Sequence, residues 1–194
     1  MISCILLSAG LSQRFGSPKA LVQLPDGQLV IEHLQQNLLD SNIDEIIIVL
    51  GAYVNEIKPR IFKHNKVTFV YNKDFLLGQT SSFKVGLQNV STKSQAVMLL
   101  PVDFSLVQTE TFNILIEQFN HHPQKIVIPS YSGKNGHPPI FPIYLSPEFL
   151  ALENNFGLNT VIHNHSRELK IFPVVDSGVV KTFNTKEEFG KLFI

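Results

Sequence analysis

Short, continuous apolar runs recur along the chain, separated by segments whose apolar residues are spaced three or four positions apart. Runs rich in β-branched and aliphatic residues are typical of strands that are buried on both faces of a parallel sheet. Five such runs occupy residues 2–7, 45–51, 67–72, 96–103 and 125–130. They predict five strands of one sheet.

The segments between these runs carry the spacing of amphipathic helices. Val30–Leu39 places its apolar side chains on one stripe, and Thr80–Asn89 and Glu110–Phe119 show the same spacing. A helix over Tyr53–His64 is less regular, because Pro59 would break or kink it. Alternation of strands and helices predicts a right-handed, doubly wound α/β fold.

The last third of the chain has a different pattern. Residues 138–145 are rich in proline and apolar residues, which indicates an extended segment. Two short helices are expected over residues 147–155 and 160–164. A strand is expected over 169–175, and a closing helix over 186–193.

Composition limits the size and the partners of the protein. Its 194 residues suffice for one substantial core, and no linker, repeat or low-complexity segment interrupts them, so we expect a single domain over residues 1–194. The 16 Lys and Arg residues balance 16 Asp and Glu residues. A broad basic face for nucleic acid is therefore not expected, whereas a small anionic ligand needs only a few local cations.

The N-terminal segment contains the one cysteine of the chain. Because Cys4 lies inside the first apolar run, we interpret it as a small buried hydrophobe rather than a nucleophile. That run is too short to span a membrane and has no preceding basic region, unlike a signal peptide. We therefore expect a cytoplasmic protein without a membrane partner.

A loop of small residues at positions 8–19 follows the first run. In an open parallel sheet, ligands bind beyond the carboxyl ends of the strands. Gly10 and Gly16 give backbone freedom, small side chains expose main-chain N–H groups to an anion, and Arg14 and Lys19 add positive charge. The loop therefore indicates phosphate binding, although GxGxxG and GxxxxGK[ST] are absent. An ordinary turn with two solvated cations is the alternative.

The segment LSAGLSQRFGSPKAL resembles the signature L-A-[AG]-G-x-S-x-R-[MF]-G-x-x-K of the MobA-like NTP transferase family, with the molybdenum cofactor cytidylyltransferases as its nearest branch. Three more stretches resemble family motifs in the same order: NKDFLLGQTSSFKVGL (72–87), MLLPVDFSLV (98–107) and SGKNGHPPIF (132–141). The resemblance covers nearly the whole chain. It implies a Rossmann-like nucleotidyltransferase fold, with a mostly parallel sheet and helices on both faces.

The resemblance also implies a reaction. A nucleotidyl group, CMP from CTP, would pass to a phosphorylated acceptor such as molybdenum-molybdopterin, and pyrophosphate would leave. Ala9 stands where guanylyltransferases of the family tend to have glycine, and its methyl group would narrow the space beside the base in favour of a pyrimidine. The implied partners are CTP or another NTP, Mg²⁺, the acceptor, and a molybdoenzyme or its chaperone.

The catalytic roles implied by the resemblance fall to Lys19, Arg14 and Asp103. The two cations would stabilise charge on the phosphates. Asp103 and Asn184 would hold the magnesium ion, which commonly takes one or two carboxylates and several waters. Alternatively, Asp103 caps the helix that begins near Gln108.

Binding roles are implied for two further sets of residues. Gly136, His137 and Pro138 would contact the acceptor, although His137 could instead be a structural residue of a turn-rich loop. Ser81 and Ser82 open a helix, which they could cap or where they could contact base and ribose. The nucleotide-binding residues would be Leu7, Ser8, Ala9, Gly10, Ser12, Arg14, Lys19, Gly78, Ser81 and Ser82.

Three positions depart from the family pattern. Asn184 stands where a second acidic metal ligand is expected, Asn155 replaces an acid, and Asn159 replaces an arginine. A neutral amide oxygen binds magnesium less tightly than a carboxylate. Three alternatives remain open. The acceptor is different and less charged, the enzyme is slow, or the site is degenerate and the protein is a nucleotide or cofactor carrier.

Other chemistry is less favoured. The loop lacks the G-x-G-T-R-L form of sugar-phosphate nucleotidyltransferases and the fingerprint of NAD-dependent oxidoreductases. The pairs His121–His122 and His163/His165 have no partner ligands at zinc spacing. We interpret these histidines as solvated surface residues.

Overall fold

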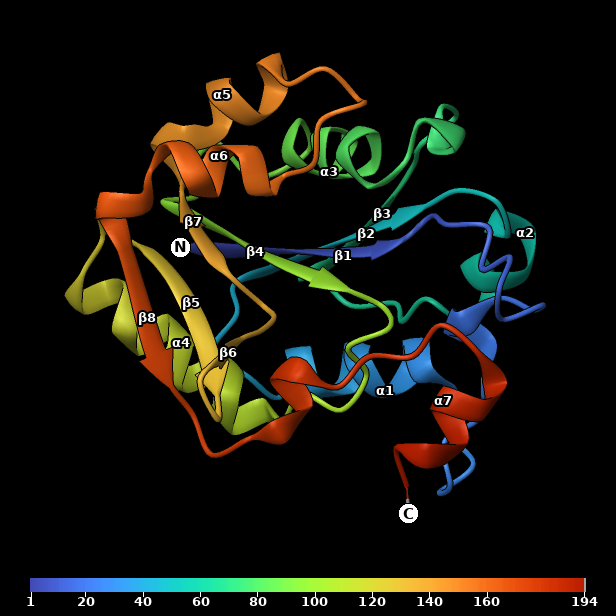
Figure 1. Ribbon diagram of the computed structural model, residues 1–194. Coiled ribbons are helices and arrows are strands. Elements are labelled where there is room, and N and C mark those ends of the chain that lie inside the picture. The colour runs from blue at the N-terminus through green and yellow to red at the C-terminus, as the bar shows by residue number, and fades with distance from the viewer. Residues whose placement is uncertain (194) are drawn as a thin grey trace.

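Eight strands form one mixed sheet in the computed structural model, which describes residues 1–193 (Figure 1). The strand order is β3-β2-β1-β4-β7-β5-β6, and β8 pairs with β5. Strand β1 (Ile2–Ser8) runs parallel to β2 (Glu45–Leu50) and β4 (Ala96–Pro101), and β2 runs parallel to β3 (Val67–Tyr71). These four strands form the parallel half of the sheet that the apolar runs predict.

The other half of the sheet is mixed. Strand β5 (Ile126–Tyr131) is parallel to β8 (Leu169–Pro173) but antiparallel to β6 (Lys134–Asn135) and β7 (Ile140–Pro142). Strand β7 is also antiparallel to β4, so it separates β4 from β5. The expected extended segment over 138–145 is therefore only partly strand, because a 3₁₀ turn follows β7.

Helices cover both faces of the sheet, as expected (Figure 1). Helices α1 (Val30–Leu39) and α4 (Thr109–His121) pack on one face. Helices α3 (Gln79–Leu87), α5 (Ser146–Ala151) and α6 (Asn159–Asn164) pack on the other. Within residues 1–193, no helix combines the length and the apolar character that a membrane crossing requires.

The core has two layers, because successive side chains of a strand point to opposite faces. In β1, Cys4 and Leu6 join the cluster that includes α1, whereas Ile5 and Leu7 join the cluster that includes α3. Burial raises the pKa of the Cys4 thiol, so the thiol stays protonated and unreactive. The interpretation of Cys4 as a buried hydrophobe is confirmed.

Several helices are shorter than their patterns predict. The segment expected over Tyr53–His64 forms only α2 (Val54–Ile57) and a 3₁₀ turn at Lys58–Arg60, because Pro59 cannot donate a helical hydrogen bond. The closing helix α7 (Lys186–Lys191) begins where expected, and α5 ends before the expected residue 155.

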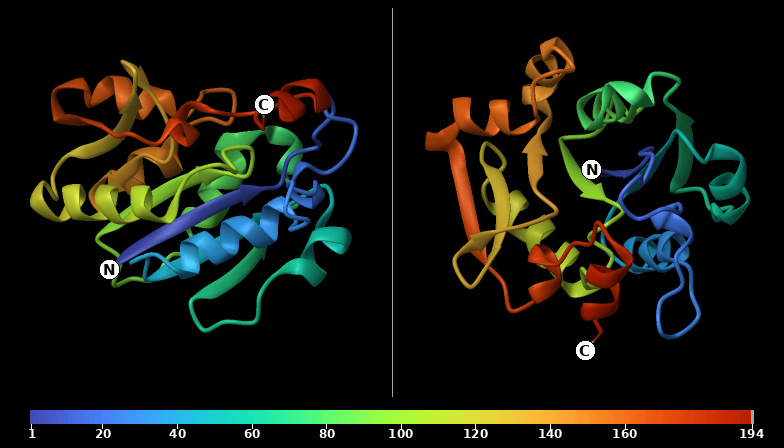
Figure 2. Two further views of the ribbon diagram at one scale, coloured as in Figure 1. Left: turned by 90° about the horizontal axis from the view of Figure 1, so that it is seen from below. Right: turned by 45° about the vertical axis from the view of Figure 1, so that its right-hand side comes forward.

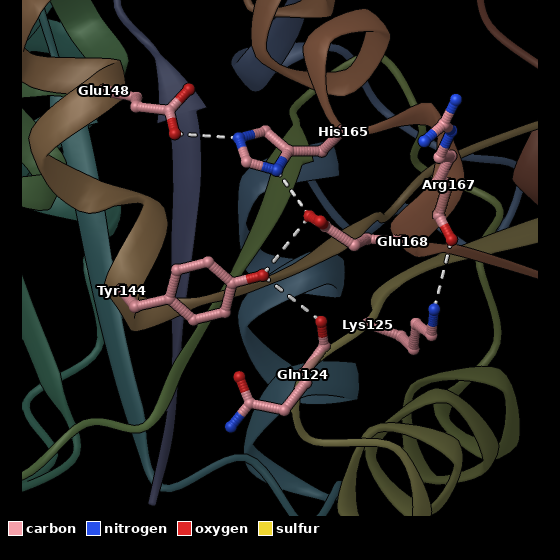
Figure 3. A network of polar contacts seen from close by, with 7 residues as sticks. All are labelled: Gln124, Lys125, Tyr144, Glu148, His165, Arg167 and Glu168. Atoms are coloured by element: carbon pink, nitrogen blue, oxygen red, sulfur yellow. Dashed lines mark hydrogen bonds and ion pairs between the residues drawn. The ribbon is translucent and has the colours of Figure 1, made fainter.

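A polar network joins α5 to the chain that leads into β8 (Figure 3). His165 Nε2 lies 2.7 Å from Glu148 Oε1, and His165 Nδ1 is hydrogen-bonded to Glu168. The Tyr144 hydroxyl donates to the Gln124 carbonyl oxygen at 3.2 Å and also contacts Glu168. His165 is half-buried rather than fully solvated, because the tertiary fold places two carboxylates around it at the surface.

This network makes stability depend on pH. Burial opposes protonation of His165, but hydrogen bonds and charges from Glu148 and Glu168 outweigh it and raise the pKa of His165. A raised folded-state pKa stabilises the fold below the unfolded-state pKa, and this stabilisation is lost as pH rises through the folded-state value.

His165→Gln should therefore lower the free energy of unfolding more at about pH 5.5 than at about pH 9, as measured by urea denaturation. His163→Gln is the matched control, since His163 is exposed on the same segment. An equal loss for His165→Gln at both pH values would contradict the charged pairing.

Candidate functional site

A cavity of about 400 Å³ opens at the carboxyl ends of β1 and β4. This volume lies within the usual range of small-molecule sites. Residues 7–14 and 18–20 form one wall, and the ends of β4 and the start of α3 form others. The other residues that line the cavity are Tyr53, Ile57, Phe75, Gly78, Gln79, Ser82, Pro101, Val102, Asp103 and Asn184.

The loop after β1 is shaped by a tight turn. The Ser12 carbonyl oxygen accepts hydrogen bonds from the backbone N–H of Phe15 and Gly16, at 2.9 and 3.0 Å. Gly16 has a φ of 79°, in the left-handed region that favours glycine. Gly10 is not in that region, and an added Cβ there would meet no heavy atom within 4 Å. The expectation of backbone freedom holds for Gly16, while Gly10 leaves space open at the cavity.

The chain that follows β2 holds this loop in place. The Ala52 N–H donates to the Ala9 carbonyl oxygen at 3.1 Å, and the Tyr53 hydroxyl donates to the Leu11 carbonyl oxygen at 3.0 Å. A Cβ on Gly51 would collide with the Ala9 backbone, so only glycine permits this approach. The glycine at the end of an apolar run was a usable signal, but sequence reasoning missed it together with Tyr53.

The charged residues singled out in the sequence meet in this cavity. Lys19 Nζ donates to Asp103 Oδ2 and to Asn184 Oδ1, both at 3.1 Å. Arg14 donates to the same Asn184 oxygen at 3.0 Å. Figures 1 and 2 show the C-terminal segment lying beside the loop after β1, which explains how positions so distant in sequence come together.

Asp176 contacts the start of α4. Asp176 Oδ2 accepts hydrogen bonds from the Gln108 N–H at 2.9 Å and from the Thr111 hydroxyl at 2.8 Å. Within residues 1–193, Asp103 makes no hydrogen bond to α4, so the capping alternative for Asp103 is wrong. Its carboxylate faces Lys19 in the cavity instead.

The start of α3 contributes part of the second wall. Gly78 and Ser82 line the cavity, and Gly78 has a φ of 93°. Ser81 lies outside the cavity lining: its hydroxyl donates to the carbonyl oxygens of Asp74 and Gly78 at 3.0 Å and accepts from Asn72. Neither serine side chain caps the helix, since both hydroxyls bond to carbonyl groups.

The three residues expected to contact an acceptor, Gly136, His137 and Pro138, lie outside the cavity lining, and His137 lies near Asp103. The His137 ring stacks on Phe104 with 4.2 Å between ring centroids, and the His137 backbone N–H donates to the Val179 carbonyl oxygen. Burial lowers the pKa of His137, and the negative charge of Asp103 offsets part of this effect. Gly136 packs against Val179, and Pro138 is buried.

One buried hydroxyl at the cavity lacks a partner. Ser8 is 4% exposed, and its Oγ has no hydrogen-bond partner among residues 1–193. Buried polar atoms are nearly always hydrogen-bonded, so this atom is suited to a ligand in the cavity it lines. Phe75 and Gln79 also line the cavity; both lie within the stretch 72–87 that resembles a family motif, but neither was named as a site residue from the sequence.

The cavity contains few oxygen ligands for a metal ion. Asp103 is the one carboxylate among the lining residues, and Asn184 adds an amide oxygen. In the described part of the chain, no cluster of three or more His, Cys, Asp or Glu side chains could hold a metal ion. Magnesium commonly binds through one or two carboxylates together with waters and substrate phosphates. The residues therefore fit a Mg²⁺ that arrives with a ligand's phosphates.

Two curated proteins are similar to this chain over most of its length. Molybdenum cofactor cytidylyltransferase of Escherichia coli (strain K12) is 27% identical over 137 residues, covering 71% of this chain and 68% of that protein. Nicotine blue oxidoreductase of Paenarthrobacter nicotinovorans is 28% identical over 200 residues, covering 98% and 96%. The two relatives are thus named for different reactions.

Solved structures confirm the fold. Rv0371c from Mycobacterium tuberculosis H37Rv superposes with a TM-score of 0.85 at 21% identity, covering 98% of this chain and 96% of that one. A nucleotidyl transferase from Methanothermobacter thermautotroptrophicus gives 0.84 at 18% identity, covering 99% and 95%. The family model for the MobA-like NTP transferase domain matches residues 4–169, which contain most of the cavity lining. The chain belongs to the MobA-like NTP transferase family.

Proposed function

We propose that this protein transfers the CMP group of CTP to a phosphorylated acceptor of the molybdopterin type and releases pyrophosphate. The observation that carries the proposal is the meeting of Arg14, Lys19 and Asp103 in one cavity at the carboxyl ends of β1 and β4. Two cations beside one carboxylate suit the phosphates of a nucleotide and an accompanying divalent ion.

The cavity offers separate surfaces for the phosphates and the base. The phosphates would lie along residues 8–19, within reach of the unpartnered Ser8 hydroxyl. The base would lie toward Phe75 and Gln79, which supply an apolar face and an amide. Ala9 lines the same space and, with its methyl group, favours the smaller pyrimidine.

The proposed transfer uses the two cations to hold negative charge. A phosphate oxygen of the acceptor attacks the α-phosphorus, the bond from that phosphorus to the bridging oxygen breaks, and pyrophosphate leaves with the electron pair. Lys19 and Arg14 stabilise the charge that develops on the phosphate oxygens. Asp103 and Asn184 would hold Mg²⁺, which would supply further charge neutralisation.

The acceptor would enter beside Asp103, next to His137. An acceptor phosphate is already ionised near neutral pH, so its attack needs no general base. Because burial lowers the pKa of His137, this side chain would contact the acceptor as a neutral imidazole. Asn155 and Asn159 are exposed and lie outside the cavity lining.

A nucleotide or cofactor carrier with little transfer activity is the second candidate. One observation favours it: Asn184 provides a neutral oxygen where the family pattern has an acid.

A panel of ATP, CTP, GTP and UTP, each with Mg²⁺ and with or without a molybdopterin-type acceptor, separates the two candidates. We expect CTP with the acceptor to release pyrophosphate faster than GTP by about tenfold or more, because the base wall discriminates by size. Equal rates for all four would contradict the base choice. Stabilisation by CTP in a thermal shift, without pyrophosphate release from any pair, would support the carrier.

Lys19→Ala should lower the rate of pyrophosphate release by about 10²–10³-fold, since it removes one electrostatic stabiliser of the transferred phosphate. The matched control is Lys93→Ala, at an exposed lysine just before β4 begins, at the opposite edge of the sheet. A loss of less than about threefold for Lys19→Ala, with the control unchanged, would contradict the role of Lys19.

A further inference from the structure

Asn184 is the shared hydrogen-bond acceptor of both loop cations. Its Oδ1 accepts from Arg14 at 3.0 Å and from Lys19 Nζ at 3.1 Å. Lys19 Nζ also reaches Asp103 Oδ2 at 3.1 Å. A single amide oxygen thus holds two positively charged groups side by side at the wall of the cavity.

The fold fixes Asn184 independently of any ligand. Its backbone N–H donates to Glu188 Oε2 at 2.6 Å, in the first turn of α7. The preceding residue, Phe183, is fully buried, and Lys19 Nζ lies 5.3 Å from its ring centroid. Phe15 of the loop packs edge-on against Phe183, with 5.5 Å between ring centroids. The loop and the C-terminal segment therefore form one packed unit before a ligand arrives.

The charge of residue 184 determines how strongly Arg14 and Lys19 can bind phosphate. With the amide, Arg14 and Lys19 meet one carboxylate at the cavity wall, Asp103; the Glu188 carboxylate lies behind Asn184, where it accepts from the Asn184 backbone N–H and forms no ion pair with either cation within residues 1–193. A carboxylate at position 184 would form ion pairs with both Arg14 and Lys19. Phosphate would then have to displace those pairs or bring a divalent ion to offset the second acid.

We infer that Asn184 is a positioning residue that presents Arg14 and Lys19 as a preformed phosphate receptor, so that this chain binds a nucleoside triphosphate without a divalent metal ion. The donor set agrees, because Asp103 is the one carboxylate among the lining residues and already pairs with Lys19. The inference rests on the proposed nucleotide site and concerns binding, whereas Mg²⁺ keeps its proposed part in the transfer.

Calorimetric titration of CTP into the full chain, with Mg²⁺ or with EDTA, tests this inference. The dissociation constant of the wild-type protein should differ by less than about threefold between the two conditions, because protein cations neutralise the phosphates. In Asn184→Asp, affinity in EDTA should fall by about tenfold or more, and Mg²⁺ should restore most of it.

Two further variants separate charge from position. Asn155→Asp adds the same charge at an exposed residue outside the cavity lining, and it should bind CTP like the wild type. Asn184→Ala removes the shared acceptor without adding charge, so it should weaken binding equally with Mg²⁺ and with EDTA. Melting temperatures without ligand identify any variant that does not fold, and the wild-type comparison needs no variant.

The outcomes distinguish the inference from the proposed function. Wild-type binding that appears with Mg²⁺ and disappears in EDTA overturns the inference and leaves the proposed function standing. No binding of CTP or any other NTP in either condition overturns both. Wild-type binding in EDTA, together with metal-dependent binding by Asn184→Asp, supports the inference.

Discussion

The parallel pairing of β1 with β2 and β4 is the constraint on which the site depends. It sets Ser8 opposite Leu50 and Leu7 opposite Pro101, so three strands end at one edge of the sheet. The chain leaving each end then meets the others: the loop after β1, the Gly51 turn and the segment with Asp103 line or support one cavity. A one-residue slip would turn every buried side chain of a strand to the other face, so the apolar layers hold this register.

The C-terminal segment completes the cavity through aromatic packing. Phe15, Phe183 and Phe189 pack edge to face, which fixes the loop after β1 against the start of α7. This contact brings Asn184 to Arg14 and Lys19 across most of the sequence. The polar part of the site is therefore positioned by an apolar contact, and ordering the loop beforehand lowers the entropic cost of binding.

Membership of the MobA-like NTP transferase family is consistent with this division of the site. The loop that would hold phosphates keeps its cations, while the neutral residues Asn155 and Asn159 lie away from the cavity lining. Two relatives named for different reactions are each similar to this chain over most of their length. Different activity names within one fold are expected, since function resides in sites built on a shared fold.

The sequence by itself determined the buried strands, the main helices, the family and the loop after β1 as the candidate site, because apolar periodicity and contiguous motifs are local properties. The tertiary structure alone decided that β7 enters antiparallel between β4 and β5, that Asp176 rather than Asp103 contacts the start of α4, and that two carboxylates surround His165. It also decided that Asn184 joins the two cations. Each of these depends on side chains or strands far apart in the chain, whose meeting is set by packing and leaves no local pattern.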